Sequence, residues 1–189
     1  MVEVQMMHQD RNNQLRLLRR YLQENSVRNS LGILVQRQGK ERLSNPARLK
    51  HHDVPVLNLL SSDLCRRLQA EICGPFLVRH PLFRVCMHLD DGWLAEFCMS
   101  AVSVVHHHKD DNLFLAGNRS ENAFVLIDGS IQYLQDPETS PALEATSTNV
   151  DHYSWLCEAA LWAEWVHVGR AVTTSSTRML VINADACSK

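Results

Sequence analysis

The hydrophobic pattern of the sequence changes near residue 103, and this change limits the fold more than any other feature. Before it, apolar residues recur every three or four positions, which is the period of an amphipathic α-helix. After it, runs of β-branched and apolar residues alternate with turn residues, which is typical of short antiparallel strands. Helices first and strands second predict an α+β fold, in which an N-terminal helical linker precedes an antiparallel, jelly-roll-like β-roll.

The helical part contains at least four predicted helices. The first two lie within residues 14–43, and residues 61–63 cap a third that Gly74-Pro75 is expected to interrupt. A last helix follows Asp90 or Asp91, one of which is its expected cap. The apolar faces expected for the first three helices are Leu15, Leu18 and Leu22; Leu31, Leu34 and Val35; and Leu64, Leu68 and Ile72.

Short strands are predicted from about residue 103 to residue 182. Asp128-Gly129 separates two of them and is the strongest hairpin or bulge signal in the chain. Residues 137–151 are rich in Pro, Ser and Thr, which predicts a mobile loop between strands. Residues 155–165 predict one short helix that is embedded among the strands.

Composition places the chain among ordinary globular proteins. With 189 residues, 45% of them hydrophobic, and a formal net charge of −2, it can bury a core, and its charge does not favour nucleic acid as a partner. Its longest apolar run, residues 97–105, is far shorter than the ~20 residues of a membrane helix, and no signal peptide is visible. Six cysteines without a C-x-x-C pair fit a reduced, cytoplasmic protein.

No residue pattern indicates catalysis or a metal site. His106, His107 and His108 are adjacent, but on a strand only the first and third share a side. Because no third ligand is in sight, we interpret them as a solvated strand end. The Ser, His and Asp residues form no nucleophile elbow. We therefore expect a protein that is not an enzyme and has neither metal nor cofactor.

A single carboxylate stands where the embedded helix is expected to begin. Glu158 follows Trp155-Leu156-Cys157 and precedes short apolar residues. Three interpretations are open: an acid favoured by the helix dipole in the first turn, a solvated surface acid, or an acceptor for a ribose hydroxyl. A short helix among strands also directs backbone N–H groups toward a phosphate, so a nucleotide site belongs among the hypotheses.

Several segments follow one another in an order known from another class of protein. These are LLRRYLQENSVRNSL, LLSSDLCRRLQAEICGPFLVRHPLF, KDDNLFLAG, NAFVLIDGSIQYL and WLCEAALWAEWVHVGRAVTTSSTRMLVI. The first two resemble the helical C-linker of tetrameric ion channels. The others resemble strands of the cyclic nucleotide-binding domain that follows this linker, and its phosphate-binding cassette F-G-E-x-x-L-x-x-x-x-R-x-A-T.

The resemblance implies a cytosolic gating module of a cyclic-nucleotide-gated or related voltage-gated channel. Residues 1–100 would be the C-linker-like segment, and residues 101–189 a cyclic nucleotide-binding-like β-roll that lacks the family's C-terminal lid helices. It also implies cyclic AMP or cyclic GMP as the ligand, a homo-tetramer through the linker helices, and membrane association only within a full-length channel. The ligand-binding residues that it implies are Leu156, Cys157, Glu158, Ala159, His167, Val168 and Arg170, with Glu158 on the ribose.

The cassette departs from the family where the phosphate would bind. Cys157 stands in the place of a glycine, and two tryptophans add bulk. Counted from Glu158 without a gap, the family's arginine falls on His167, and Arg170 lies three residues further on. The loss of a charged hydrogen-bond pair costs ~1.5–3 kcal/mol, or ~10- to 100-fold in affinity. We therefore predict that nucleotide binding is weakened or lost.

Three other functions are compatible with the resemblance, and one of them is disfavoured. The chain could be a functional cyclic AMP or cyclic GMP sensor, or a non-sensing assembly and interaction module that keeps the fold without the ligand. A soluble regulatory subunit of the kinase type is disfavoured, because the first half of the chain resembles a channel linker.

Overall fold

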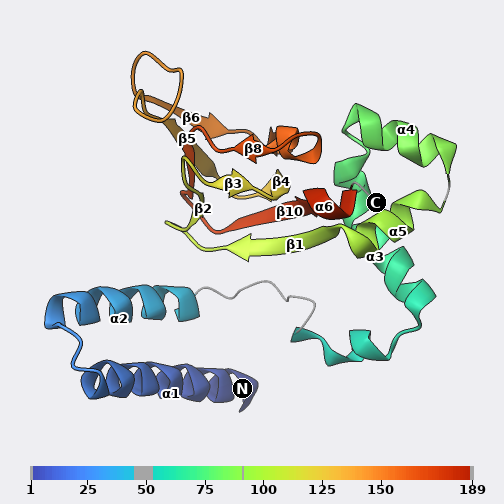
Figure 1. Cartoon of the computed structure of the whole chain (residues 1–189). Helices are drawn as coiled ribbons and strands as arrows, with labels where there is room; N and C mark the ends of the chain where they lie inside the picture. Colours follow the sequence, from blue (N-terminus) through green and yellow to red (C-terminus); the bar gives the residue numbers. More distant parts are fainter. Residues whose placement is uncertain (1, 45–52, 91, 188–189) are drawn as a thin grey trace. The chain divides into compact units, whose positions relative to one another are not determined.

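The structure is a computed structural model that describes residues 2–44, 53–90 and 92–187 (Figure 1). The chain divides into two compact units, Met1–Pro55 and Val56–Lys189. This division lies well before the boundary at residue 100 that the sequence predicts. The predicted boundary divides the chain by function and not by compactness. It is therefore not tested by this division and stays a prediction.

The first unit is a pair of helices, α1 (Val2–Glu24) and α2 (Asn29–Ser44). The predicted stripe of α1 faces α2, since Leu22 is buried and Leu18 lies against Gly39, where an added Cβ would meet its Cδ2 at 3.1 Å. The face predicted for α2 is wrong in two of its three residues, because Leu31 and Leu34 are exposed. Gly32 is buried in their place, while Gly39 is the glycine of this helix that packs against α1, on Leu18.

Three helices open the second unit after the 3₁₀ turn η2 (Pro55–Leu59): α3 (Ser62–Leu77), α4 (Pro81–Leu89) and α5 (Trp93–Ser100). Ser61 caps α3 as predicted, since its hydroxyl accepts from the Leu64 N–H at 3.4 Å. The expected cap of α5 is wrong, because Gly92 holds that position and Asp90 accepts from the Gly92 N–H at 2.8 Å. Asp91 lies outside the described residues.

Helix α3 continues past Gly74-Pro75, where the sequence predicted an interruption. Its buried residues are Cys73, Gly74 and Leu77, and Gly74 packs so closely on Leu94 of α5 that a Cβ would lie 3.1 Å from Cδ2. The stabilisation from this packing exceeds the cost of the backbone hydrogen bond that Pro75 removes. The predicted apolar face of α3 is wrong at Leu64 and Ile72. Both are exposed, because the helix buries Cys73, Gly74 and Leu77 instead.

Ten strands and two short helices complete the second unit. They are β1 (Val102–His107), β2 (Asn112–Phe114), β3 (Arg119–Ser120), β4 (Asn122–Asp128), β5 (Ile131–Gln135), β6 (Thr146–Val150), β7 (Trp155–Leu156), η3 (Glu158–Leu161), β8 (Trp165–Val166), β9 (Arg170–Thr173), β10 (Thr177–Asn183) and α6 (Ala184–Cys187). All described pairs are antiparallel, in sheets of order β1-β10-β4-β7, β2-β9-β5-β6 and β3-β8. The predicted α+β class, helices followed by an antiparallel roll with a short embedded helix, is confirmed.

Asp128-Gly129 does not form a hairpin, because β4 and β5 belong to different sheets. It carries the chain from one sheet to the other, beside a register shift between Arg178 and Met179 of β10. Gly129 has a φ of +96°, and a Cβ would lie 2.5 Å from the carbonyl oxygen of Ser176. The hairpin interpretation of this dipeptide is therefore wrong, and the register shift next to Asp128 agrees with the bulge interpretation.

The stretch 137–151 is only partly the loop that its composition predicts. Thr146–Val150 forms β6, which pairs with β5 along its whole length from Ile131↔Val150 to Gln135↔Thr146. The polar and β-branched residues of this strand suit a sheet edge that faces solvent on both sides, and four of its five residues are exposed.

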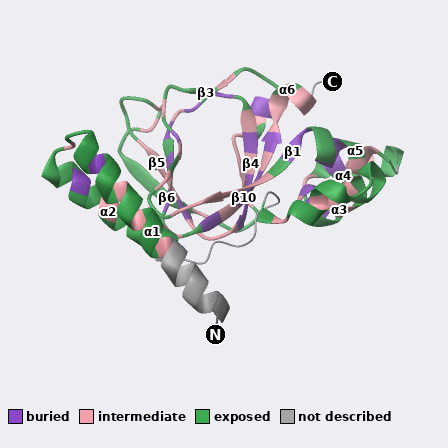
Figure 2. Cartoon of the chain, turned by 90° about the horizontal axis from the view of Figure 1, so that it is seen from below, coloured by how far each residue is buried: buried purple, intermediate pink, exposed green. Residues whose placement is uncertain are grey.

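The second unit has two apolar clusters, one on each face of the sheet that contains β4. Ala123, Val125 and Ile127 belong to a cluster shared with α3, α4 and α5, and Leu126 belongs to a second cluster between the two large sheets. Phe83 of α4, which is 1% exposed, is central to the first cluster. Figure 2 shows the buried residues along β4 and β10. The helices after residue 61 therefore share their core with the roll.

Thr173 fastens β9 to the turn between β1 and β2. Its buried hydroxyl accepts from the Asp111 N–H at 2.9 Å and lies within hydrogen-bond distance of the carbonyls of His108 and Asp111. We expect Thr173→Val to lower the free energy of unfolding by about 1–3 kcal/mol, because buried polar groups then lose a partner. Urea unfolding followed by tryptophan fluorescence measures this. Thr173→Ser, which keeps the hydroxyl, should cost less, and equal losses in both variants would contradict the explanation.

Candidate nucleotide-binding cassette

The cassette begins with a turn that has an unusual backbone. Leu156 ends β7 opposite Phe124, and Cys157 then adopts φ 58° and ψ 28° in the left-handed region. A side chain in this conformation costs roughly 1–2 kcal/mol, which explains why the corresponding family position is a glycine. Glu158 and Ala159 follow as the first residues of η3, a single 3₁₀ turn that is shorter than the helix predicted over residues 155–165.

Glu158 faces the helices of the second unit. Its Oε1 accepts from Nε2 of His80 at 2.9 Å, and its side chain is 47% exposed. The His80 ring packs against Phe83 and Trp155, which belong to the cluster on the helical side of the sheet. The resemblance implies a contact of this carboxylate with the ribose of a ligand; the structure shows it bound to His80. Its role as the ribose acceptor stays a prediction.

His167 lies inside the roll. It is 5% exposed, and its ring stacks on Phe114 with centroids 4.0 Å apart and planes 5° from parallel. Its Nδ1 lies 3.3 Å from Sγ of Cys157, and its backbone bonds Gly117 and Asn118 at 2.8 and 2.9 Å. Burial lowers the pKa of His167, so the imidazole is neutral at pH 7. A neutral ring stacked on Phe114 offers no positive charge to a phosphate.

The remaining predicted ligand residues lie on the way to β9. Val168 is half-buried, and Arg170 is exposed at the first position of β9, opposite Leu134. Between them Gly169 is packed so tightly that a Cβ would lie 2.5 Å from the Leu134 carbonyl oxygen. In the part of the chain that the structure describes, no hydrogen bond or ion pair joins Arg170 to Glu158 or His167.

The structure thus brings the side chains of Cys157 and His167 together, while the side chain of Glu158 contacts His80 instead. Burial raises the pKa of the Cys157 thiol to about 11, so the thiol is protonated at neutral pH. His80 begins the HPLF segment, which contributed to the resemblance, but it was not predicted to be a partner of Glu158. The two residues are 78 positions apart, and no local pattern predicts their contact.

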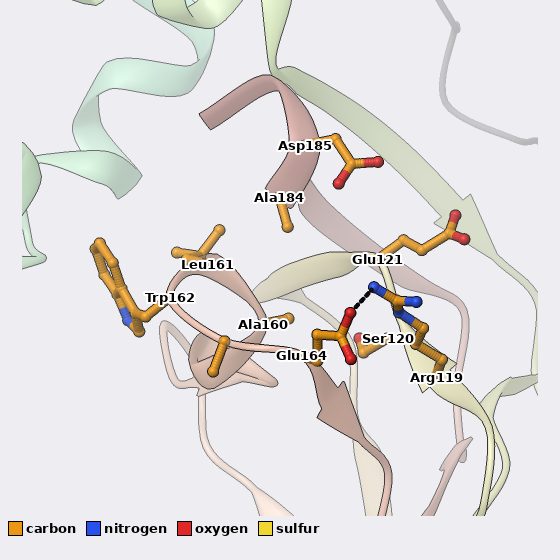
Figure 3. A pocket seen from close by; sticks show the side chains of 10 residues that line it. Arg119, Ser120, Glu121, Ala160, Leu161, Trp162, Glu164, Ala184 and Asp185 are labelled. Carbon is orange, nitrogen blue, oxygen red and sulfur yellow. Dashed lines mark hydrogen bonds and ion pairs between the residues drawn. The ribbon is translucent and has the colours of Figure 1, made fainter. Parts of the chain in front are cut away.

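A hollow of about 430 Å³ lies beside η3, between this turn, β3 and α6 (Figure 3). None of the seven predicted ligand residues lines it. Its charged residues are Glu121, Glu164 and Asp185 against a single cation, Arg119, whose guanidinium bonds Glu164 at 2.8 Å. Because carboxylates outnumber the cation, this hollow is unfavourable for the phosphate of a nucleotide.

Two further features of the described residues bear on function. No helix within residues 2–44, 53–90 and 92–187 is both long and apolar enough to cross a bilayer. The same ranges contain no group of three His, Cys, Asp or Glu residues arranged for a metal ion. His106 and His107 lie in β1, where they pair with Arg178 and Thr177 of β10.

Comparisons with known proteins give similarities in structure alone. No protein-family model matches the sequence, and no curated protein matches it. The chain is similar to a cyclic nucleotide-binding-like protein from Brucella abortus bv. 1 str. 9-941, with 18% identity and a TM-score of 0.48 over 59% of this chain and 90% of that one. It is also similar to the N-terminal domain of a transcriptional regulator from Streptomyces coelicolor A3(2), with 23% identity and a TM-score of 0.48 over 59% of this chain and 73% of that one.

The buried state of His167 predicts a pH effect. Because its folded-state pKa is lowered from the ordinary value of 6.5, the unfolded chain takes up the proton first as the pH falls. Its contribution to stability is therefore present above about pH 6.5 and is lost progressively below it. The difference in free energy of unfolding between the wild type and His167→Gln should shrink from about pH 8 to about pH 5.5. A difference that is independent of pH would show that His167 is not held neutral.

Proposed function

We propose that this chain is the cytosolic regulatory module of an ion channel, a cyclic nucleotide-binding-like roll with a helical linker, in which nucleotide binding is weakened or lost. The observation that carries the loss of binding is the environment of His167. The residue at the position of the family's arginine is buried, uncharged and stacked on Phe114. It cannot form the charge-assisted pair by which a phosphate is held.

Other parts of the cassette support weak binding. Glu158, the proposed ribose acceptor, already accepts a hydrogen bond from His80. Arg170 lies at an exposed position of β9, without an ion pair to the cassette among the described residues. The loss of one charge-assisted pair alone lowers affinity by ~10- to 100-fold.

The channel assignment comes from the resemblance of the helical half to a C-linker. In that role the core shared by α3, α4, α5 and the roll would transmit movement between the roll and the linker. The proposed homo-tetramer through the linker helices is supported by apolar side chains that the first unit leaves exposed, among them Leu17 (64%), Tyr21 (62%), Ile33 (66%) and Leu34 (57%). The alternative function, a non-sensing assembly module, would associate through the same exposed apolar side chains.

One observation favours the alternative of a functional sensor. Cys157, which stands in the place of the family's glycine, has a left-handed backbone that glycine adopts most readily, and Glu158 is the first residue of the short helix. A conformational change that turns the carboxylate into the roll would restore one of the ligand contacts. The sensor therefore remains the second candidate.

Saturation binding of labelled cyclic AMP and cyclic GMP to the intact chain separates the two candidates. For the wild type we expect no saturable binding below high micromolar ligand, and the same result for Glu158→Ala. Saturable binding at low micromolar ligand that Glu158→Ala abolishes would overturn the proposal in favour of the sensor. Glu164→Ala is the matched control, because it removes an exposed carboxylate of the same segment that is not among the predicted ligand residues.

A further inference from the structure

The contact between His80 and Glu158 joins two parts of the second unit that are distant in sequence. His80 is the N-cap residue of α4, immediately after α3, and Glu158 is the first residue of η3. The Nε2···Oε1 distance is 2.9 Å, and the two residues are 78 positions apart. The turn between α3 and α4 is thus bound to the one carboxylate that the proposed function assigns to the ligand.

The His80 side chain is held in place by its neighbours. It is 11% exposed, and its ring centroid lies 5.1 Å from that of Phe83 and 4.8 Å from that of Trp155. Its other ring nitrogen, Nδ1, is buried and has no hydrogen-bond partner among the described residues. The ring is therefore a donor that is held in a fixed position. The bond to Glu158 costs little conformational entropy on the His80 side, because that side chain is already ordered.

The bond to His80 holds the Glu158 side chain on the helical side of the sheet, away from the interior of the roll. Leu156 and Cys157 pack with the cluster between the two large sheets, which is the interior of the roll. Glu158 instead bonds a ring that packs in the cluster on the helical side of the same sheet. A ligand inside the roll can take this carboxylate only if it turns away from His80.

We propose that His80 competes with the ligand for Glu158, so that a bound ribose hydroxyl and the bond to the α3–α4 turn exclude each other. This inference rests on the proposed assignment of Glu158 to the ribose of a cyclic nucleotide. Coupling between two binding events is reciprocal, so a nucleotide weakens the bond to His80 by the factor by which His80 weakens the nucleotide. Binding in the roll would thereby release the turn that joins α3 to α4.

Three variants separate competition from loosening of the core. His80→Phe keeps an aromatic ring between Phe83 and Trp155 but removes the donor. His80→Gln places an amide N–H near the position of Nε2 and should restore the bond. Phe83→Leu disturbs the same aromatic cluster while leaving the donor in place.

The affinities of these variants for cyclic AMP and cyclic GMP, measured by titration at concentrations up to the millimolar range, test the competition. We expect His80→Phe to bind about 3- to 10-fold more tightly than the wild type. His80→Gln and Phe83→Leu should stay close to the wild type. Equal affinity of His80→Phe and the wild type would overturn the inference, as would an equal gain in Phe83→Leu.

Hydrogen exchange in peptides that contain the α3–α4 turn gives a second measurement, which needs no ligand. In both His80→Phe and Glu158→Ala, exchange should be several-fold faster than in the wild type, and the double variant should be no faster than either single one. An unchanged rate would overturn the inference. If no variant binds nucleotide, the competition is overturned while the proposal of a module with lost binding stands. Tight binding by the wild type would overturn that proposal, and the His80→Phe comparison would still decide the competition.

Discussion

Phe83→Ala is expected to lower the free energy of unfolding of the second unit by about 3–5 kcal/mol, the range for removing a buried aromatic ring. Phe83 is 1% exposed and lies 5.3–6.0 Å, between ring centroids, from Phe97, Trp155 and Trp93. It contacts α5 and β7 from α4, so the cavity opens where the helices meet the roll. Urea unfolding followed by tryptophan fluorescence reports on this unit, because all four tryptophans lie after residue 55.

Trp162→Ala is the control for this prediction. Trp162 is also a large aromatic residue of the second unit, but it is 55% exposed and borders the hollow beside η3 (Figure 3). Its removal should cost about 1 kcal/mol or less, as for most exposed residues. If Phe83→Ala cost no more than Trp162→Ala, the helices after residue 61 would not share a core with the roll.

Gly129→Ala is expected to cost about 3 kcal/mol, from two effects at one position. A φ of +96° strains any residue with a Cβ, and this Cβ would lie 2.5 Å from the Ser176 carbonyl oxygen and 2.7 Å from Cα of Thr177. Both neighbours are backbone atoms, so no side-chain rotation relieves the clash. The β4–β5 connection or the beginning of β10 must shift.

Two other glycines separate these effects. Gly117 has a φ of +83° with nothing within 4 Å of an added Cβ, so Gly117→Ala should cost about 1 kcal/mol from strain alone. Gly169 lies outside the positive-φ region but would place a Cβ 2.5 Å from the Leu134 carbonyl oxygen, so Gly169→Ala should cost about 2 kcal/mol from crowding alone. The same urea titration measures all three. A loss in Gly129→Ala no larger than that in Gly117→Ala would contradict the clash.

The periodicity of the sequence predicted the helices and the antiparallel strands, because period depends on local geometry. It failed for the faces that α2 and α3 bury. Leu31 and Leu64 are exposed, whereas Gly32 is buried and Gly74 packs directly on Leu94 of α5. The hydrophobicity of a residue does not contain that information.

The cassette shows the same limit at the level of the site. The motif placed Glu158 at the start of the short helix and Cys157 at the position of a glycine, since both depend on a few adjacent residues. It did not predict that Glu158 binds His80 or that His167 stacks on Phe114. Both contacts join residues that are far apart in the chain, and only the folded roll determines which of them meet.

The affinity of the intact chain for cyclic AMP and cyclic GMP, measured by titration calorimetry near pH 7, tests most directly the claim that a buried, neutral His167 replaces the phosphate-binding arginine. We expect dissociation constants above about 100 µM, or no detectable heat of binding. A dissociation constant below about 1 µM would contradict the claim, because affinity of that order requires a positive charge at the phosphate.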